Sequence, residues 1–227
     1  MKTNIRTHVK KLLFFFRILK DPDLFLKNVS GVIHIGANTG QEVDEYGQYA
    51  LAVIWVEPIP EVFRALKKNI IKYPKQKAFK YLLLDSDDKD IEFKIANNNG
   101  QSSSIFDFGQ HTKIWPDIYY TKTIHLKSST LTNLVKREKI DIKKYQALVL
   151  DTQGSELLIL KGASELLKNF RYIKTEAPDF ESYLGCCLIQ DISNFLIGFG
   201  FNEIIRSKQA GRKGVGTYYD VVYERTI

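Results

Sequence analysis

Acidic residues stand at the ends of several strand-like runs in this sequence. Glu57, Asp85, Asp151 and Glu176 follow runs of apolar and β-branched residues, and Gly36 follows another such run. Short runs of this kind predict buried strands of a parallel sheet. Ligands of open α/β sheets bind beyond the carboxyl ends of the strands, so these residues should converge on one site. Carboxylates there could accept hydrogen bonds from ligand hydroxyls or take up a proton.

A glycine turn follows the first predicted strand. Its segment Gly36–Gly40 reads G-x-N-x-G, and Gly36 permits a tight turn with close approach of a ligand to the backbone. Glu57 comes 21 residues after Gly36, about where nucleotide-binding α/β folds hold ribose hydroxyls. The side-chain amide of Asn38 suits a neutral or zwitterionic group better than a diphosphate. The pattern predicts a nucleoside site, and a structural turn without a ligand is the alternative.

Apolar runs alternate with amphipathic stretches along the chain, which predicts an α/β fold with crossover helices. A final pair of extended segments, 201–206 and 218–223, should close the sheet. The polar stretch 97–117 is expected to be a long loop, and such loops in compact domains are often functional. The core strands are expected at 32–35, 52–56, 79–84, 147–150 and 172–175.

The charge of the chain is unevenly distributed. The formal net charge is +7, but residues 1–20 hold six basic and no acidic residues, so the other 207 are nearly neutral. A nucleic-acid partner is therefore not expected. The two cysteines, Cys186 and Cys187, are adjacent and should not pair with each other, which favours a cytoplasmic location.

The first 30 residues are expected to form a basic, amphipathic arm or helix ahead of a domain spanning 31–227. The apolar run inside 10–20 is too short to cross a bilayer, which needs about 20 residues. We expect a helix packed on the domain, and the alternative is weak contact of residues 1–20 with a membrane surface.

The order of several motifs resembles the FkbM family of methyltransferases. The resemblance implies a Rossmann-like, class I methyltransferase fold. Its sheet would have seven mostly parallel strands with an antiparallel last strand, and helices on both faces. It also implies S-adenosylmethionine as cofactor, with methylation of a hydroxyl in many relatives. The motifs are Gly36–Gly40, Trp55-Val56-Glu57-Pro58, Leu84-Asp85, Leu150-Asp151-Thr152-Gln153-Gly154-Ser155-Glu156 with Leu160-Lys161-Gly162-Ala163, and Lys174-Thr175-Glu176.

The resemblance assigns the cofactor contacts by position. Gly36, Asn38 and Gly40 would line the methionine part, and Glu57 would bind the ribose. Asp85, with Ser86 beside it, would face the adenine.

For catalysis, Asp151 is the first candidate for acceptor binding or general base, and Glu176 could share the task. The alternative for Asp151 is a helix N-terminal acid favoured by the macrodipole. His111 is a further candidate base, or else an exposed loop residue. Asp151 and Glu176 could instead hold a magnesium ion, but metal dependence is not favoured and no metal ligand is assigned. Thr152-Gln153 stands where the family often has Val-Glu, which leaves one acid fewer near the site.

The favoured function is therefore methylation of a hydroxyl on a small molecule or glycan. Three alternatives remain open from the sequence. An NAD-dependent oxidoreductase is disfavoured because G-x-G-x-x-G is missing. A non-catalytic, membrane-peripheral module of the same fold is the second. An RNA methyltransferase is the third, and the near-neutral domain argues against it.

Overall fold

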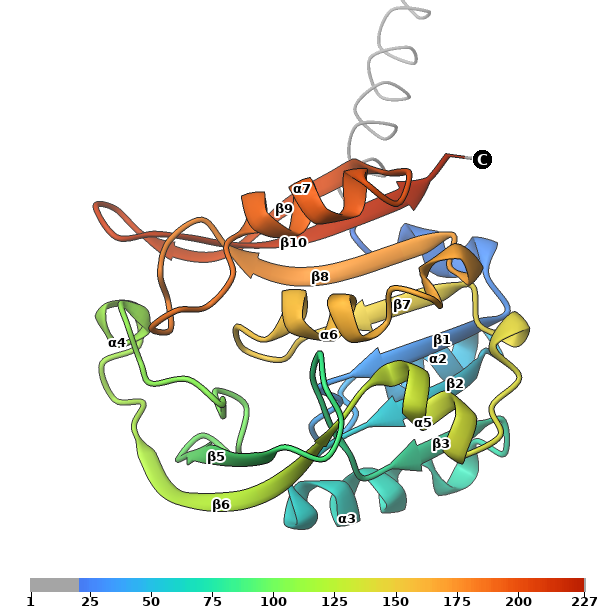
Figure 1. The fold of residues 1–227 in the computed structure, drawn as a ribbon, viewed down its shortest axis with the longest axis horizontal. Coiled ribbons are helices and arrows are strands. Elements are labelled where there is room, and N and C mark those ends of the chain that lie inside the picture. Colours follow the sequence, from blue (N-terminus) through green and yellow to red (C-terminus); the bar gives the residue numbers. More distant parts are fainter. Residues whose placement is uncertain (1–20, 227) are drawn as a thin grey trace, which may run out of the picture.

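Seven strands form the main sheet of the protein (Figure 1), seen in a computed structural model that describes residues 21–226. The strands β1, β2, β3, β7 and β8 pair in parallel, and β10 runs antiparallel to both of its neighbours. This confirms the predicted mostly parallel sheet with an antiparallel last strand. In sheet order the strands are β3 (Gln76–Phe79), β2 (Ala52–Val56), β1 (Gly31–Ile35), β7 (Ala147–Leu150), β8 (Tyr172–Pro178), β10 (Gly216–Arg225) and β9 (Phe201–Arg212).

Helices cover both faces of this sheet, as predicted (Figure 1). One face packs against α5 (Leu131–Arg137), α6 (Glu156–Gly162) and α7 (Ile189–Ile197). The other packs against the 3-10 turn η1 (Leu24–Asn28), α2 (Val43–Gln48) and α3 (Pro60–Asn69). Side chains of the central strands alternate between these two apolar layers, because successive residues of a strand point to opposite faces. The shorter helical segments are η2 (Ile70–Lys72), η3 (Ile142–Lys144), η4 (Leu167–Asn169) and α4 (His111–Ile114).

A small second sheet lies beside the main one. It contains β4 (Leu82–Leu83), β6 (Tyr120–Ser129) and β5 (Asp90–Ala96), with β5 and β6 antiparallel. The expected strand 79–84 is therefore wrong in part. In the main sheet, strand β3 ends at Phe79. Leu82 and Leu83 then belong to the second sheet, where they pair with β6.

The described part of the N-terminal region is joined to the main sheet. Phe25 and Leu26 of η1 are buried in the α2/α3 layer, and Asp23 Oδ1 accepts a 2.7 Å hydrogen bond from Lys174 Nζ. The division of the chain near residue 30 stays a prediction. The basic segment 1–20, expected to be a helix packed on the domain or, as the alternative, a weak membrane contact, lies outside the described residues. Among residues 21–226, no helix has the length and apolar character needed to cross a membrane.

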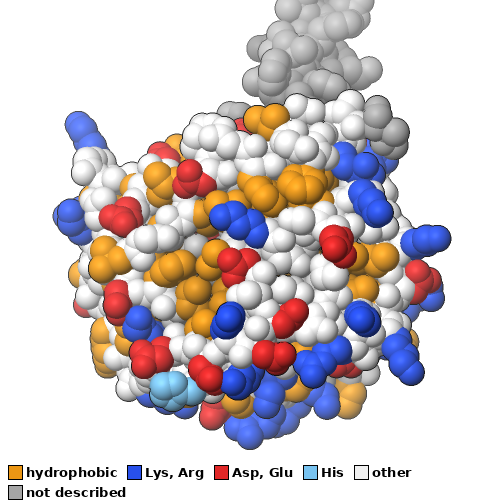
Figure 2. Space-filling model, in the orientation of Figure 1, with side chains coloured by type: hydrophobic (Ala, Val, Ile, Leu, Met, Phe, Trp, Pro, Cys, Tyr) orange, Lys and Arg blue, Asp and Glu red, His pale blue; other side chains and the backbone are white. Residues whose placement is uncertain are grey.

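The surface of the domain carries both signs of charge. Figure 2 shows Lys and Arg side chains interspersed with Asp and Glu on the face in view. This distribution agrees with the nearly neutral charge of the chain after residue 20.

Candidate active site

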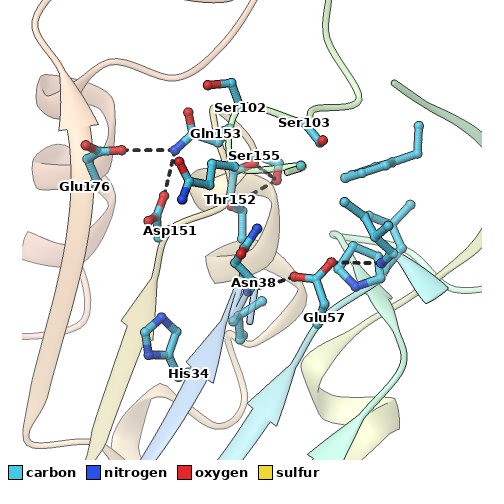
Figure 3. A pocket seen from close by; sticks show the side chains of 18 of the residues that line it. His34, Asn38, Glu57, Ser102, Ser103, Asp151, Thr152, Gln153, Ser155 and Glu176 are labelled. Carbon is cyan, nitrogen blue, oxygen red and sulfur yellow. Dashed lines mark hydrogen bonds between the residues drawn. The ribbon is translucent and has the colours of Figure 1, made fainter. Parts of the chain in front are cut away.

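A cavity of about 540 Å³ opens beyond the carboxyl ends of β1, β2 and β7, next to Glu176 of β8 (Figure 3). Its size is in the range of small-molecule and cofactor sites. The walls bring together Gly36, Asn38, Glu57 and Asp151, as the positions of the strand ends predicted. The long polar segment 97–117 supplies another wall, with Ser102, Ser103, His111 and Trp115 among its contributions.

Glu57 is held rigidly at the end of β2. Its Oε1 accepts the backbone N–H of Ile59 at 2.8 Å, and its Oε2 accepts that of Asn38 at 2.9 Å. The side chain is 3% exposed, and burial raises the pKa of the Glu57 carboxyl to about 7, an effect that these hydrogen bonds oppose. Each oxygen keeps a lone pair for a further donor. The fixed carboxyl can therefore accept hydroxyl groups of a ligand.

The glycine turn brings β1 close to β7. Gly36 has φ +82°, and a Cβ built on it would stand 1.8 Å from the backbone oxygen of Asp151. Only glycine fits at position 36, because any side chain would clash with the backbone just after β7. Asn38 lines the cavity, but its side chain stabilises the turn: Oδ1 accepts the Thr39 N–H at 2.8 Å and Nδ2 donates to the Asn99 carbonyl at 3.2 Å.

Three of the predicted cofactor contacts lie elsewhere. Asp85 is exposed and accepts a 3.1 Å hydrogen bond from Ser86 Oγ, and neither residue lines the cavity. This corrects their expected place beside the adenine: the chain leaves the main sheet after Phe79 and reaches the C-terminal end of α6, where Asp85 packs on Gly162. Gly40 also lies outside the cavity wall, packed against side chains of α2 and α3.

Two acids and one amide meet at the far side of the cavity. Gln153 Nε2 donates to Asp151 Oδ1 at 2.7 Å and to Glu176 Oε2 at 3.0 Å (Figure 3). Burial raises the pKa of both carboxyls, and their mutual repulsion raises that of Glu176 further. Sequence reasoning found both acids but missed the bridge. The signal that could have found it was the Gln in the position where the family often has Glu.

Glu156 supports the turn that carries Gln153. Its carboxylate accepts the backbone N–H groups of Thr152 at 2.8 Å and Gly154 at 3.0 Å. The side chain is buried and does not line the cavity. Glu156 thus stabilises the turn after β7 by accepting its backbone N–H groups.

His111 is buried in an aromatic cluster, so the expectation of an exposed loop residue is wrong. Its ring lies 5.1 Å from that of Phe108 and 4.7 Å from that of Trp115, and Nδ1 is 2.8 Å from the Tyr218 hydroxyl. Burial lowers the pKa of His111 to about 4, so the ring is neutral at pH 7. His111, Trp115 and Tyr218 line the same cavity as the two acids.

His34 is a buried residue of β1. It is 4% exposed, stacks on Trp55 with ring centroids 5.0 Å apart, and contacts the Tyr46 hydroxyl at 3.2 Å. Burial lowers the pKa of His34 to about 3. Cys186 and Cys187 are both free, as predicted.

The charge of the cavity wall has one sign. Glu42, Glu57, Asp151 and Glu176 line it, and no Lys or Arg stands among the described lining residues. Such a site favours a ligand with positive charge over a phosphate or diphosphate.

Residues 34–206 match the methyltransferase FkbM domain. The chain belongs to the FkbM methyltransferase family. It is therefore an S-adenosylmethionine-dependent methyltransferase, as the resemblance predicted. A search of curated protein sequences finds no match.

Solved structures share the fold of this FkbM-family protein. TrmK of M. capricolum, solved in complex with S-adenosylhomocysteine, is 8% identical with a TM-score of 0.51, over 90% of this chain and 67% of that one. An uncharacterised protein from Listeria monocytogenes serotype 4b is 11% identical with a TM-score of 0.52, over 92% of this chain and 66% of that one. These likenesses support the class I methyltransferase fold and nothing finer.

The residues of the cavity fit the family's cofactor. S-adenosylmethionine carries a sulfonium and an ammonium against one carboxylate, and its net positive charge matches the acidic wall. The fixed carboxyl of Glu57 offers hydrogen-bond acceptors in the cavity, and its contact with the ribose stays a prediction. Tyr81, Leu82 and Leu83 line the cavity as well, and sequence reasoning did not single them out. They lie just after the shortened third strand and offer an apolar surface.

Proposed function

We propose that this FkbM-family enzyme methylates a hydroxyl oxygen on a small molecule or glycan. The observation that carries the proposal is the buried carboxyl of Glu57, fixed by two backbone N–H groups, in one cavity with the Asp151–Glu176 pair. This arrangement combines hydrogen-bond acceptors for the hydroxyls of a nucleoside with carboxyl groups able to take up a proton. A hydroxyl acceptor needs both, because it must lose its proton during transfer.

In this proposal the cavity has a cofactor side and an acceptor side. Glu57 accepts the ribose hydroxyls, and the wall at Gly36 and Asn38 receives the methionine end. Tyr81, Leu82 and Leu83 form the apolar wall for the adenine in place of Asp85 and Ser86. When bound, the cofactor supplies an electrophilic methyl group on its sulfonium sulfur.

The acceptor side lies between the acid pair and the aromatic cluster around His111. Asp151 or Glu176 orients the hydroxyl and takes its proton, and a raised pKa suits a base that works near neutral pH. His111 is neutral with a low pKa, so it is a weaker base and serves better as a hydrogen-bond partner. Trp115 and Tyr218 offer flat apolar surface to the acceptor and help to exclude water.

Binding of S-adenosylhomocysteine, measured by isothermal titration calorimetry, tests the cofactor side. We expect saturable binding with one site per chain. Failure of well-folded protein to bind would refute the assignment of Glu57.

The acceptor side of the proposal is tested by identifying a methylated product. The enzyme would be incubated with 13C-methyl S-adenosylmethionine and a panel of polyols, glycans, phenols and amines, and products would be analysed by NMR. The carbon chemical shift separates O-methyl from N-methyl groups. Transfer only to amines would contradict the proposed O-methylation while leaving the methyltransferase assignment intact.

The NAD-dependent alternative conflicts with the charge of the site. A dinucleotide fold places its pyrophosphate at a helix N-terminus, but here Glu42 precedes α2 and lines the cavity. A second negative charge there is unfavourable. We expect no change in NADH fluorescence on mixing with the protein.

A further inference from the structure

Gln153 connects two acids from different strands. Asp151 follows β7 and Glu176 lies in β8, and both carboxyls accept hydrogen bonds from the same amide nitrogen, at 2.7 Å and 3.0 Å. A primary amide has two N–H groups, so each acid receives one of them. Both donors of the Gln153 side chain are thereby used (Figure 3).

The orientation of this amide is fixed from its other end. The Tyr183 hydroxyl lies 2.7 Å from Gln153 Oε1, and a weaker contact of 3.4 Å joins it to the Ser102 carbonyl. Burial keeps the pKa of Tyr183 well above its usual value, so the hydroxyl retains its proton and can donate. In this orientation both N–H groups of the amide have a carboxyl acceptor and its oxygen has a hydroxyl donor.

The backbone also holds Gln153 in place. Its φ is +57°, a left-handed conformation that is uncommon for a residue with a side chain. The Gln153 carbonyl accepts a 2.8 Å hydrogen bond from Ser104 Oγ, which ties it to the segment 97–117. This conformation persists because its surroundings determine it, and such positions concentrate at functional sites.

A bridge between two carboxyl groups is a task that divalent cations also perform, with oxygen ligands. An amide differs from a cation in one respect: it supplies hydrogen bonds without positive charge. Within the described residues, no three or more His, Cys, Asp or Glu side chains are grouped so that they could hold a metal ion. With only an amide between them, two neighbouring carboxyls avoid being ionised together.

We propose that Gln153 is a positioning residue that takes the place of a bridging cation and joins Asp151 and Glu176 into a pair sharing one proton. The role of this pair in catalysis rests on the proposed function. The hydrogen bonds that join the pair do not depend on it. One member of the pair is ionised and can accept the acceptor's proton, and the other stays protonated and can donate a hydrogen bond. Because the amide carries no charge, the pair retains its proton near neutral pH, where a cation would expel it.

Titration with Mn²⁺ alone tests this inference without any acceptor. In Gln153→Glu, three carboxyl groups would meet with no donor between them, so a cation should bind. In Gln153→Ala the amide is removed and its place is open. We expect both variants to bind Mn²⁺ at least about tenfold more tightly than the wild type, measured from the EPR signal of free Mn²⁺.

The matched control is Gln101→Glu, which adds the same charge to the wall of the same cavity. It should leave the Mn²⁺ affinity at the wild-type value. Equal affinity in the wild type and both Gln153 variants, with their folding checked by circular dichroism, would overturn the inference. So would a wild type that binds as tightly as Gln153→Glu.

A second readout follows the shared proton directly. In protein labelled with 13C at Asp and Glu carboxyl carbons, one wild-type carboxyl of this pair should titrate near neutral pH. The same concentration of diamagnetic Mg²⁺ should remove that titration in Gln153→Glu and leave it in the wild type. Ordinary acidic titration of both wild-type carboxyls would refute proton sharing. A protein that passes these tests but does not bind S-adenosylhomocysteine would refute the proposed function alone.

Discussion

The Tyr218 hydroxyl contacts Nδ1 of His111 at 2.8 Å, and the opposite ring nitrogen, Nε2, has no hydrogen-bond partner among the described residues. His111 is 2% exposed, so this contact satisfies one of two buried polar atoms of the ring. Neutral buried polar groups cost free energy when they lose their partner. The pair of Tyr218 and His111 thus links the aromatic cluster to the last strand of the sheet.

Replacing Tyr218 by Phe should destabilise the protein. The change removes only the hydroxyl and leaves His111 without a partner on either nitrogen, which costs about 1–3 kcal/mol of unfolding free energy. Urea denaturation at pH 7 measures the loss. Tyr219→Phe is the control, because the Tyr219 hydroxyl makes only a 3.5 Å contact with Asp179. Equal stability of the two variants would contradict the role of the Tyr218 hydroxyl.

Gly36→Ala should be far more costly than Gly214→Ala. The two glycines have similar φ values, +82° and +79°, so backbone strain of about 1–2 kcal/mol is common to both. Only Gly36 has a neighbour in the way, the backbone oxygen of Asp151, whereas the Cβ position of Gly214 has nothing within 4 Å. We expect a further loss of about 1–3 kcal/mol or more in Gly36→Ala, from thermal or urea unfolding. Similar costs would show that the turn can move away from β7.

Glu57→Ala should weaken the binding of S-adenosylhomocysteine by about 1.5–3 kcal/mol, through the loss of a charge-assisted contact. Calorimetry at pH 8 measures the change, with the exposed Glu61→Ala as control. An unchanged dissociation constant would remove Glu57 from the cofactor site.

The wild-type affinity for S-adenosylhomocysteine should also depend on pH. The pKa of Glu57 is about 7 in the folded protein, so the carboxyl becomes ionised as pH rises through that value. The ionised form is the better acceptor for ribose hydroxyls, and affinity should rise from pH 6 to pH 8. Glu57→Gln cannot ionise there and should lose this part of the dependence. Identical pH profiles in both proteins would contradict it.

Asp151→Asn should abolish turnover and leave cofactor binding largely intact. The change keeps the shape of the side chain but removes its ability to accept a proton, which typically contributes a factor of about 10²–10⁴ in rate. Turnover with an acceptor identified by NMR, and calorimetry with S-adenosylhomocysteine, measure the two effects. Turnover at the wild-type rate would remove Asp151 from the chemistry.

Buried His34 should make stability fall in acid. Its folded pKa of about 3 lies below the unfolded value of 6.5, so the unfolded state binds the proton first. The stability associated with the neutral ring is present above pH 6.5 and is lost as pH falls toward 3. Comparing wild type with His34→Gln, the difference in unfolding free energy should shrink by about 1.4 kcal/mol per pH unit between pH 6 and 4. Exposed His125→Gln is the control. A constant difference would contradict this.

The local pattern of the sequence determined the strands that position the site. Ala52–Val56 forms β2 with the predicted bounds, and Pro60 stands in the first turn of α3, where its missing N–H costs nothing. Strand ends in a parallel sheet share one edge, so the meeting of Glu57, Asp151 and Glu176 followed from the order of the elements alone. These features depend on short-range patterns of apolar residues, which a single sequence records.

Tertiary structure alone decided the features that depend on contacts between distant segments. Asp85 leaves the site because Leu82 and Leu83 pair with β6, more than 40 residues later. His111 is buried because Tyr218 of β10 meets it across the cavity wall. Gln153 bridges two acids because Tyr183 fixes its amide from the other side. In each case the side chain's neighbours come from remote parts of the chain, and no local periodicity encodes them.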